Sequence, residues 1–340
     1  MRMKKFLILS AAVLCAVACS NTYEVKTAPE KAIGFGTWTE TLTKARTAGA
    51  STFVSGDSFN VEGFKTLSGS PVTVFDDVPV TYDGTNWTYE NTRFWDSNAT
   101  SYTFFAVSSP NTDLTFAADG TIAATAVNFS GKDNDILLAN SVVKTAPYNS
   151  TPVSLNFNHI GSLVDLKVKK SAALNTANAT VAITAVSLEK IDGAGKVAVT
   201  GYSTYVPTVA WTDLDGNTTY TNASGVTPVA TLPTNVGTTG DNLINTLVVI
   251  PQTLADAKIL KISYTITDAA GTVNAFANKE IKLNQFDKTD DTDNTTPFIT
   301  GWEAGKHYVY TLTIDANIIS FTGTITDWTN EDPGYNYLIN

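Results

Sequence analysis

The feature that most limits the fold of this chain is a period-two alternation of apolar and polar residues, which recurs in short runs along its length. The runs over 102–106, 260–266 and 308–314 each place apolar side chains at every second position. Successive side chains of a strand point to opposite faces, so each run predicts a strand with one buried face. Apolar residues do not keep a helical spacing over three turns in any window, and helix is expected to be minor.

Turn-forming residues separate these runs. Four Asp-Gly pairs stand between apolar segments: Asp83-Gly84, Asp119-Gly120, Asp192-Gly193 and Asp215-Gly216. Asp-Gly is typical of the tight turns that join antiparallel strands. The sequence therefore predicts an all-β chain built from hairpins that pack as β-sandwiches.

The N-terminus reads as an export signal over residues 1–18. Arg2 and two lysines precede the apolar run Phe6–Val17, which is too short to span a bilayer permanently. Because the small residues before the cleavage point end on Cys19, the motif is that of a bacterial lipoprotein, in which Cys19 is acylated and becomes the new N-terminus. An ordinary signal peptide with an incidental cysteine is the alternative, and it also leads to export.

Length and charge narrow the classes of protein further. About 320 mature residues exceed what one hydrophobic core usually serves, which favours two domains. The formal charge of −10 falls to about −13 once the cations of the signal are removed, and such an acidic chain is a poor match for nucleic acid. With Cys15 discarded and Cys19 lipidated, no disulfide and no cysteine-based metal site is expected.

Turn formers at 141–151 mark a domain boundary between the apolar run Ile136–Leu138 and a new strand at Val153. The expected organisation is the signal peptide at 1–18, a first strand and linker at 19–50, an N-terminal β-sandwich at 51–148 that includes the first strand at 31–40, and a C-terminal β-sandwich at 149–340.

Catalytic and metal-binding patterns are not evident. His159 and His307 lie in separate alternating runs, and each is interpreted as structural, with the ring of His159 expected to bond a backbone carbonyl. The acidic cluster over 287–293 lacks the central glycine and terminal glutamate of an EF-hand loop. The chain is therefore predicted to be no enzyme, with no catalytic residue, no cofactor and no metal site.

Several stretches in this order resemble the fimbrillins, the lipoprotein subunits of type V pili of anaerobic Gram-negative bacteria. The resembling segments are Ile33–Phe35, Ser55–Phe59, Trp87–Tyr89, Trp95, Tyr102–Ala106, Asp135–Ala139, Val153–His159, Val249–Gln252, Trp302–Tyr308 and Trp328. The resemblance implies two consecutive transthyretin-like β-sandwich domains and a structural role in a cell-surface pilus.

It also implies an assembly mechanism. Fimbrillins are cut by an arginine-specific protease after their first strand, and a strand from another subunit then fills the vacated groove. In this chain the displaced first strand would carry Ile33 and Phe35, and Arg46 in the following small, polar segment would be the processing site. An uncut linker arginine is the alternative interpretation of Arg46.

The strand that fills the groove needs a matching alternation. Tyr335, Tyr337 and Ile339 alternate at the C-terminus and are the preferred donor strand, within 335–340. The run Ile319–Ile325 alternates as well, and it is as readily interpreted as an ordinary strand of the second domain.

The resemblance leaves stalk, tip and anchor roles open. Other pilin subunits are the expected partners, with the outer membrane as lipid anchor before processing and a surface ligand of host or bacterial origin as a further partner. The expected location is the outer membrane, the cell surface and the fimbrium. The competing function is a surface glycan-binding lipoprotein, because the six tryptophans could supply stacking platforms for sugar rings.

Overall fold

The computed structural model describes residues 31–37, 54–109, 114–129, 135–148, 151–221, 232–288, 298–316 and 319–327. Nearly every regular element within them is a strand, which confirms the predicted all-β class. The α-helix found there, α1 (Ala172–Thr176), is a single short turn that Ser171 caps by accepting a hydrogen bond from the Leu174 amide at 3.2 Å. None of the described helices has the length and apolar character needed to cross a membrane.

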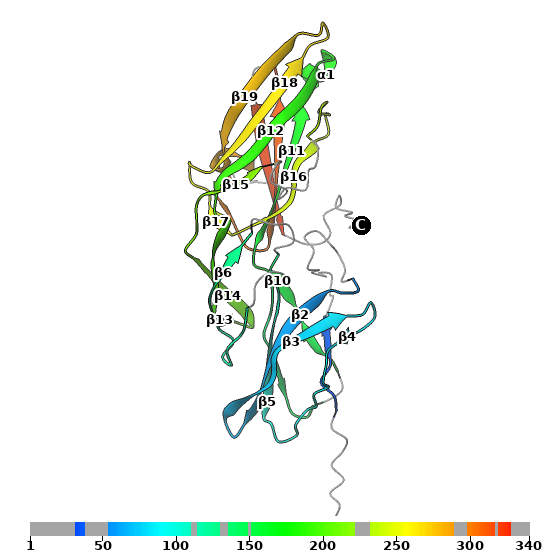
Figure 1. Cartoon of the computed structure of the whole chain (residues 1–340), viewed down its shortest axis with the longest axis vertical. Helices are drawn as coiled ribbons and strands as arrows, with labels where there is room; N and C mark the ends of the chain where they lie inside the picture. Colours follow the sequence, from blue (N-terminus) through cyan, green and yellow to red (C-terminus); the bar gives the residue numbers. More distant parts are fainter. Residues whose placement is uncertain are drawn as a thin grey trace, which may run out of the picture. The chain divides into compact units, whose positions relative to one another are not determined.

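The first large sheet contains seven strands in the order β10, β7, β5, β2, β3, β4, with β8 also paired to β5. Their bounds are β2 Ser58–Leu67, β3 Ser70–Tyr82, β4 Trp87–Thr88, β5 Ser101–Ser108, β7 Leu137–Ala139, β8 Val142–Thr145 and β10 Phe157–His159. Strands β2, β3 and β5 run side by side in Figure 1. Two further strands, β1 (Phe35–Thr37) and β9 (Val153–Leu155), form a separate parallel pair. Apolar side chains of the sheet and of this pair make one core, in which β1 is anchored.

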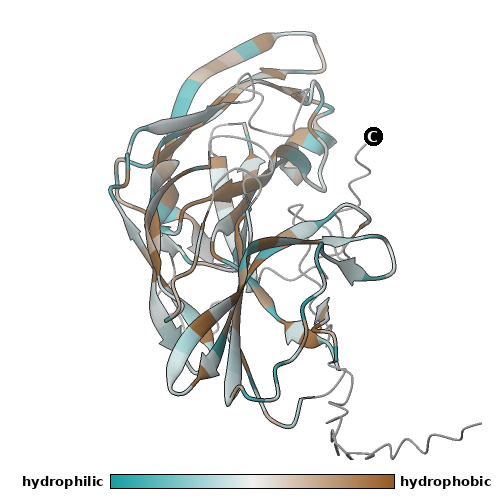
Figure 2. Cartoon of the chain, turned by 60° about the horizontal axis from the view of Figure 1, so that its bottom comes forward, coloured by the Kyte–Doolittle hydropathy of each residue, from teal (hydrophilic) through white to brown (hydrophobic). Residues whose placement is uncertain are grey.

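The alternation read from the sequence explains this core. Phe59 and Val61 of β2 are buried on the face that meets β1, and Phe104 of β5 joins them. Figure 2 shows the same pattern as short hydrophobic stretches that recur along the strands between hydrophilic ones. A glycine is required at position 63, because a Cβ there would lie 2.7 Å from the ring of Phe75 and 3.1 Å from that of Phe104.

Two more sheets form a second core. The five-stranded sheet has the order β16, β11, β22, β23, β20, and the four-stranded sheet has the order β15, β12, β18, β19. Their bounds are β11 Ser162–Lys170, β12 Thr180–Ile191, β15 Thr218–Thr221, β16 Asp241–Val249, β18 Ile259–Thr267, β19 Val273–Lys282, β20 Asp287–Lys288, β22 Lys306–Ile314 and β23 Ile319–Asp327. The turn η1 (Leu283–Gln285) follows β19, and β17 (Gln252–Thr253) pairs with β21 (Gly301–Trp302). The buried faces of these sheets share one apolar cluster.

A three-stranded sheet connects segments from both sides of the predicted domain boundary. Strand β6 (Ile122–Asn128) precedes the boundary, yet it pairs with β13 (Ala194–Ser203), which in turn pairs with β14 (Val206–Thr212). A third apolar cluster likewise contains residues from before and after residue 148. Residues 31–340 form one unit by their contacts, and the division into two domains at 148/149 stays a prediction.

Candidate functional site

The segment that contains β1 is held along both of its edges, through residues 31–33 just before β1 on one side and through β1 itself on the other. On one edge the Ile33 amide donates to the Arg93 carbonyl at 2.8 Å, and the Trp95 amide donates to the Lys31 carbonyl at 2.9 Å. On the other edge β1 runs parallel to β9, and the Val153 amide donates to the Gly34 carbonyl at 2.7 Å. We call the slot between residues 93–95 and β9 the β1 groove. A strand that leaves this groove exposes backbone donors and acceptors on both walls.

The side chains of β1 point into the core from this groove. Ile33 is 1% exposed and Phe35 is 5% exposed, as their proposed role as a displaceable strand requires. The ring of Phe35 meets four aromatic rings edge to face, with centroid distances of 5.1 Å to Phe75, 5.7 Å to Tyr89, 5.8 Å to Phe104 and 6.4 Å to Phe59. Edge-to-face pairs add to the free energy of simple burial. Phe35 is thus the principal anchor of β1.

A polar contact reinforces the apolar one. The hydroxyl of Tyr89 donates to the Ile33 carbonyl at 2.6 Å and accepts from the Arg93 amide at 3.3 Å. Burial raises the pKa of the Tyr89 hydroxyl, an effect that the nearby Arg93 partly opposes. The hydroxyl therefore stays protonated and can donate to whichever strand carbonyl occupies this position.

Arg93 fixes the wall of the groove. Its guanidinium donates to the carbonyls of Val74 at 2.8 Å and Asn91 at 2.6 Å, and it lies 4.9 Å from the ring centre of Phe75. These contacts tie the irregular segment before Trp95 to β3. This wall is therefore held to β3 by contacts that do not involve the residues of β1.

The other predicted site residues lie outside the described residues. These are the lipidation residue Cys19, the processing residue Arg46 and the donor residues Tyr335, Tyr337 and Ile339. The structure therefore brings Ile33 and Phe35 together in the groove and leaves the remaining assignments as predictions. Sequence reasoning did not assign a role to Tyr89 or Arg93, although Tyr89 belongs to one of the stretches that carried the family resemblance.

Both histidines bond carboxylates. The Nδ1 atom of His159 lies 2.7 Å from Asp135, and the Nε2 atom of His307 lies 2.9 Å from Asp165, with all four side chains buried. The expected carbonyl partner of His159 was wrong, because Asp135 precedes β7 and the pairing of β7 with β10 brings its carboxylate to the Nδ1 atom of the ring. Each histidine links two segments of the fold, which agrees with a structural role.

Another buried acid lies on β2. Glu62 is 3% exposed and accepts a hydrogen bond from the Asp77 amide at 3.0 Å. Burial raises the pKa of Glu62 to about 7, the Asp77 amide opposes this, and the nearby Asp76 and Asp77 charges add to it. The folded chain therefore retains a proton on Glu62 at pH values where the unfolded chain has lost it.

We expect this proton to make stability depend on pH. Since the pKa of Glu62 lies higher in the folded chain, stability should fall as pH rises from about 4.5 to about 7 and then level off. Glu62→Gln removes the charge and keeps the acceptor for the Asp77 amide, so it should stabilise the chain by about 2–3 kcal/mol at pH 8 and by little at pH 4. Urea unfolding at both pH values measures this. The exposed Glu90→Gln is the matched control, and an equal gain for Glu62→Gln at both pH values would contradict the expectation.

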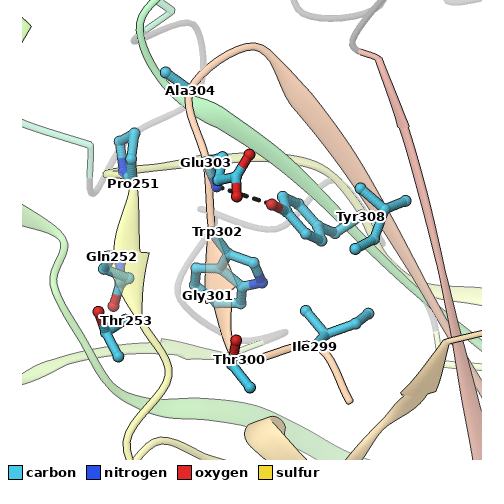
Figure 3. A pocket seen from close by; sticks show the side chains of 11 residues that line it. Pro251, Gln252, Thr253, Ile299, Thr300, Gly301, Trp302, Glu303, Ala304 and Tyr308 are labelled. Atoms are coloured by element: carbon cyan, nitrogen blue, oxygen red, sulfur yellow. Dashed lines mark hydrogen bonds between the residues drawn. The ribbon is translucent and has the colours of Figure 1, made fainter. Parts of the chain in front are cut away.

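A separate cavity of about 600 Å³ lies between β17, β21 and the end of β23. Figure 3 shows Trp302 and Tyr308 beside it, with a hydrogen bond between Glu303 and Tyr308. The Trp302 indole donates to the Tyr310 hydroxyl at 2.7 Å, and the Tyr308 hydroxyl accepts from the Glu303 amide at 2.9 Å. Both aromatic side chains are buried, so neither offers an open ring face to a ligand.

Each tryptophan among the described residues packs against other aromatic side chains or in a core. Trp95 stacks on Tyr148 with ring centres 4.9 Å apart, and Trp302 is buried as described above. Trp87 and Trp211 are half-buried and pack against Phe59 and Phe129 respectively. In the described part of the chain, no group of three or more histidine, cysteine, aspartate or glutamate side chains is arranged to hold a metal ion.

Comparisons with known proteins identify the family and the fold of this chain. A family model described as fimbrillin-like matches residues 43–328. A fimbrial protein from Bacteroides vulgatus has a similar fold, with a TM-score of 0.55 and 18% identity over 88% of this chain and 100% of that one. A candidate cell adhesion protein from Bacteroides uniformis gives a TM-score of 0.51 and 18% identity over 89% of this chain and 99% of that one. No curated protein matches significantly.

Proposed function

The chain belongs to the fimbrillin-like family, and from this we propose that it is a structural subunit of a cell-surface fimbria that supports adhesion and is assembled by strand exchange. The observation that carries the proposal is the β1 groove, in which a short strand is held between two walls and supplies Ile33 and Phe35 to the core. The role is structural and requires no catalytic residue. Its partners are other pilin subunits.

The proposed life cycle begins with export. Residues 1–18 direct the chain across the inner membrane, and acylation of Cys19 anchors it to the outer membrane before processing. A protease then cuts after Arg46, between β1 and β2, so that β1 is no longer covalently joined to the rest of the subunit. The cut chain retains a groove that another subunit can fill.

Strand exchange completes the assembly. The segment 335–340 of one subunit, with Tyr335, Tyr337 and Ile339, enters the groove of the next. The alternative donor Ile319–Ile325 is less suitable, because β23 is paired with β22 over its whole length in the second core. Removal of β23 would break that sheet, whereas 335–340 lies beyond its end.

The processing step has a direct test. Arg46→Gln should block cleavage at this position by an arginine-specific protease, and the treated variant should remain monomeric while the treated unaltered chain forms oligomers. Lys44→Gln is the matched control, since it removes a nearby cation and leaves Arg46 in place. Mass spectrometry locates the cut, and size-exclusion chromatography with electron microscopy records assembly. Oligomers of Arg46→Gln formed at the normal rate would refute the proposal.

A cut chain that stays monomeric would favour a tip or anchor role, or the glycan-binding alternative. That alternative requires exposed aromatic faces on which sugar rings can stack. The described tryptophans pack in or against the cores and do not favour it. Binding to a glycan array by a chain that never assembles would favour it over the fimbrial subunit.

A further inference from the structure

The β1 groove has two side-chain positions of different chemistry. The Ile33 position accepts an aliphatic side chain that is 1% exposed. The Phe35 position is lined by the rings of Phe59, Phe75, Tyr89 and Phe104 and accepts an aromatic side chain edge to face. A strand that replaces β1 must therefore offer an aliphatic and an aromatic residue two positions apart, and in the correct order.

The proposed donor can meet this requirement in one way. Tyr335, Tyr337 and Ile339 alternate, so a strand placed in the same direction as β1 puts tyrosine at the Ile33 position in either register. In the opposite direction, the register with Tyr335 at the Phe35 position again puts a tyrosine, Tyr337, at the Ile33 position. The other register places Ile339 at the Ile33 position and Tyr337 at the Phe35 position. Among the four placements, this one alone provides the aliphatic–aromatic order.

We infer that the donor strand enters the groove with its chain direction opposite to that of β1, with Ile339 replacing Ile33 and Tyr337 replacing Phe35. The inference rests on the proposed strand exchange and specifies its register. It identifies the occupant of the groove as segment 335–340 of a second copy of this chain.

The positions between the two pockets agree with this placement. A Cβ at Gly34 would meet no atom within 4 Å, whereas a Cβ at Gly36 would lie 3.4 Å from the Cβ of Pro152. The inferred direction places the larger Leu338 at the open Gly34 position and Asn336 at the Gly36 position. The same-direction register centred on Tyr337 would reverse these two and place the larger Leu338 at the Gly36 position, where its Cβ would already be in van der Waals contact with Pro152.

The reversed chain direction also makes replacement of β1 by the donor energetically more favourable. At present β1 pairs with β9 in parallel over three residues, and Ala32, which precedes β1, forms a single antiparallel bridge with Phe94 of the opposite wall. An opposite-running donor pairs with β9 in the antiparallel sense, which is slightly more stable per residue. The incoming strand therefore gains antiparallel pairing along the three residues of the longer wall and gives it up only at the single bridge on the other wall.

Engineered disulfides test the direction. The mature chain with Cys19→Ser contains no cysteine, and Phe94 is 46% exposed, so Phe94→Cys is a suitable probe in the acceptor. The Ala32 position that faces Phe94 would be taken by Asn340 in the inferred direction and by Gly334 in the same-direction register centred on Tyr337. Acceptor chains that carry Phe94→Cys and lack 335–340 are cut after Arg46 and mixed with uncut donor chains that carry either Asn340→Cys or Gly334→Cys.

We expect Asn340→Cys to form the intermolecular disulfide at least about tenfold faster than Gly334→Cys, as seen on non-reducing gels and by mass spectrometry of the linked peptides. A donor with Tyr335→Ile and Ile339→Tyr offers the aliphatic–aromatic order in the same-direction register. In this donor Gly334→Cys, and no longer Asn340→Cys, should form the disulfide faster. Preferential linkage of Gly334→Cys in the original pattern, or oligomers that link through neither residue, would overturn the inferred direction. Absence of oligomers from the cut, cysteine-free chain would instead refute strand exchange between copies of this chain, and the inferred direction with it, and would favour a tip or anchor role or the glycan-binding alternative.

Discussion

Replacing Phe35 with alanine should lower the free energy of unfolding of the uncut chain by about 3–5 kcal/mol. The ring fills a pocket made by Phe59, Phe75, Tyr89 and Phe104, with centroid distances between 5.1 and 6.4 Å. Those rings belong to β2, β3, β5 and the segment after β4, which are fixed by their own pairings. The pocket therefore cannot collapse fully around alanine, and a cavity adds to the lost burial.

Urea unfolding of the uncut chain measures this effect. Gly34→Ala is the matched control on the same strand, because its new methyl group meets no atom within 4 Å and should change stability by about 0.5 kcal/mol or less. If Phe35→Ala and Gly34→Ala unfold at the same urea concentration, Phe35 does not anchor β1.

Although Phe35→Ala destabilises the uncut chain, it should favour assembly of the cut chain. In a cut chain β1 is held without a covalent link, and its retention depends on Ile33, Phe35 and the backbone bonds to both walls. A weaker anchor makes the groove available more often to a donor strand. The anchor of β1 thus sets both the stability of the stored subunit and the barrier to exchange.

The fold class could be predicted because its signal is local. Alternation over 102–106, 260–266 and 308–314 predicted strands that the structure contains as β5, β18 and β22, with the expected faces buried. Ile33 and Phe35 were instead assigned to a first strand because of the family resemblance. A period of two appears in the sequence wherever one face of a strand is buried.

The walls of the groove could not be predicted from alternation. Tyr89 and Arg93 lie in an irregular segment, and their contacts with Ile33 depend on how that segment returns to β3. The partner of His159 was missed for a similar reason, because Asp135 lies 24 residues away and only strand pairing brings it close. Contacts between distant segments depend on tertiary pairing, which leaves no periodic signal.

The pairing of β6 with β13 makes the same point at a larger scale. The turn formers near residue 148 predict a boundary there. Strand β6 lies before that boundary, yet it pairs with β13 in a sheet whose other strands lie after it. Whether a strand pairs with its neighbours in sequence or with a distant edge depends on which edges are available, and composition does not report this.

Deleting Tyr335–Asn340 should abolish polymer formation and leave the monomer folded. The deleted residues lie beyond Asp327, where β23 ends, so the three apolar clusters keep all of their described members. Electron microscopy after cleavage should show no filaments, and the urea midpoint of the uncut variant should equal that of the unaltered chain. Filaments of normal length from the deletion variant would rule out 335–340 as the donor, and Asn336→Ser, which keeps the alternation, should still polymerise.

Mixing the deletion variant with the intact chain makes this prediction sharper. A cut chain without 335–340 has a groove to fill and no donor, whereas an uncut intact chain has a donor and an occupied groove. Each has one of the two functions, so the mixture should stop at a 1:1 dimer, because that dimer has neither a free groove nor a free donor strand. Light scattering after size-exclusion chromatography measures the mass of the product. Oligomers larger than a dimer would require a second donor in the chain, and a mixture that stays monomeric would show that 335–340 does not fill the β1 groove.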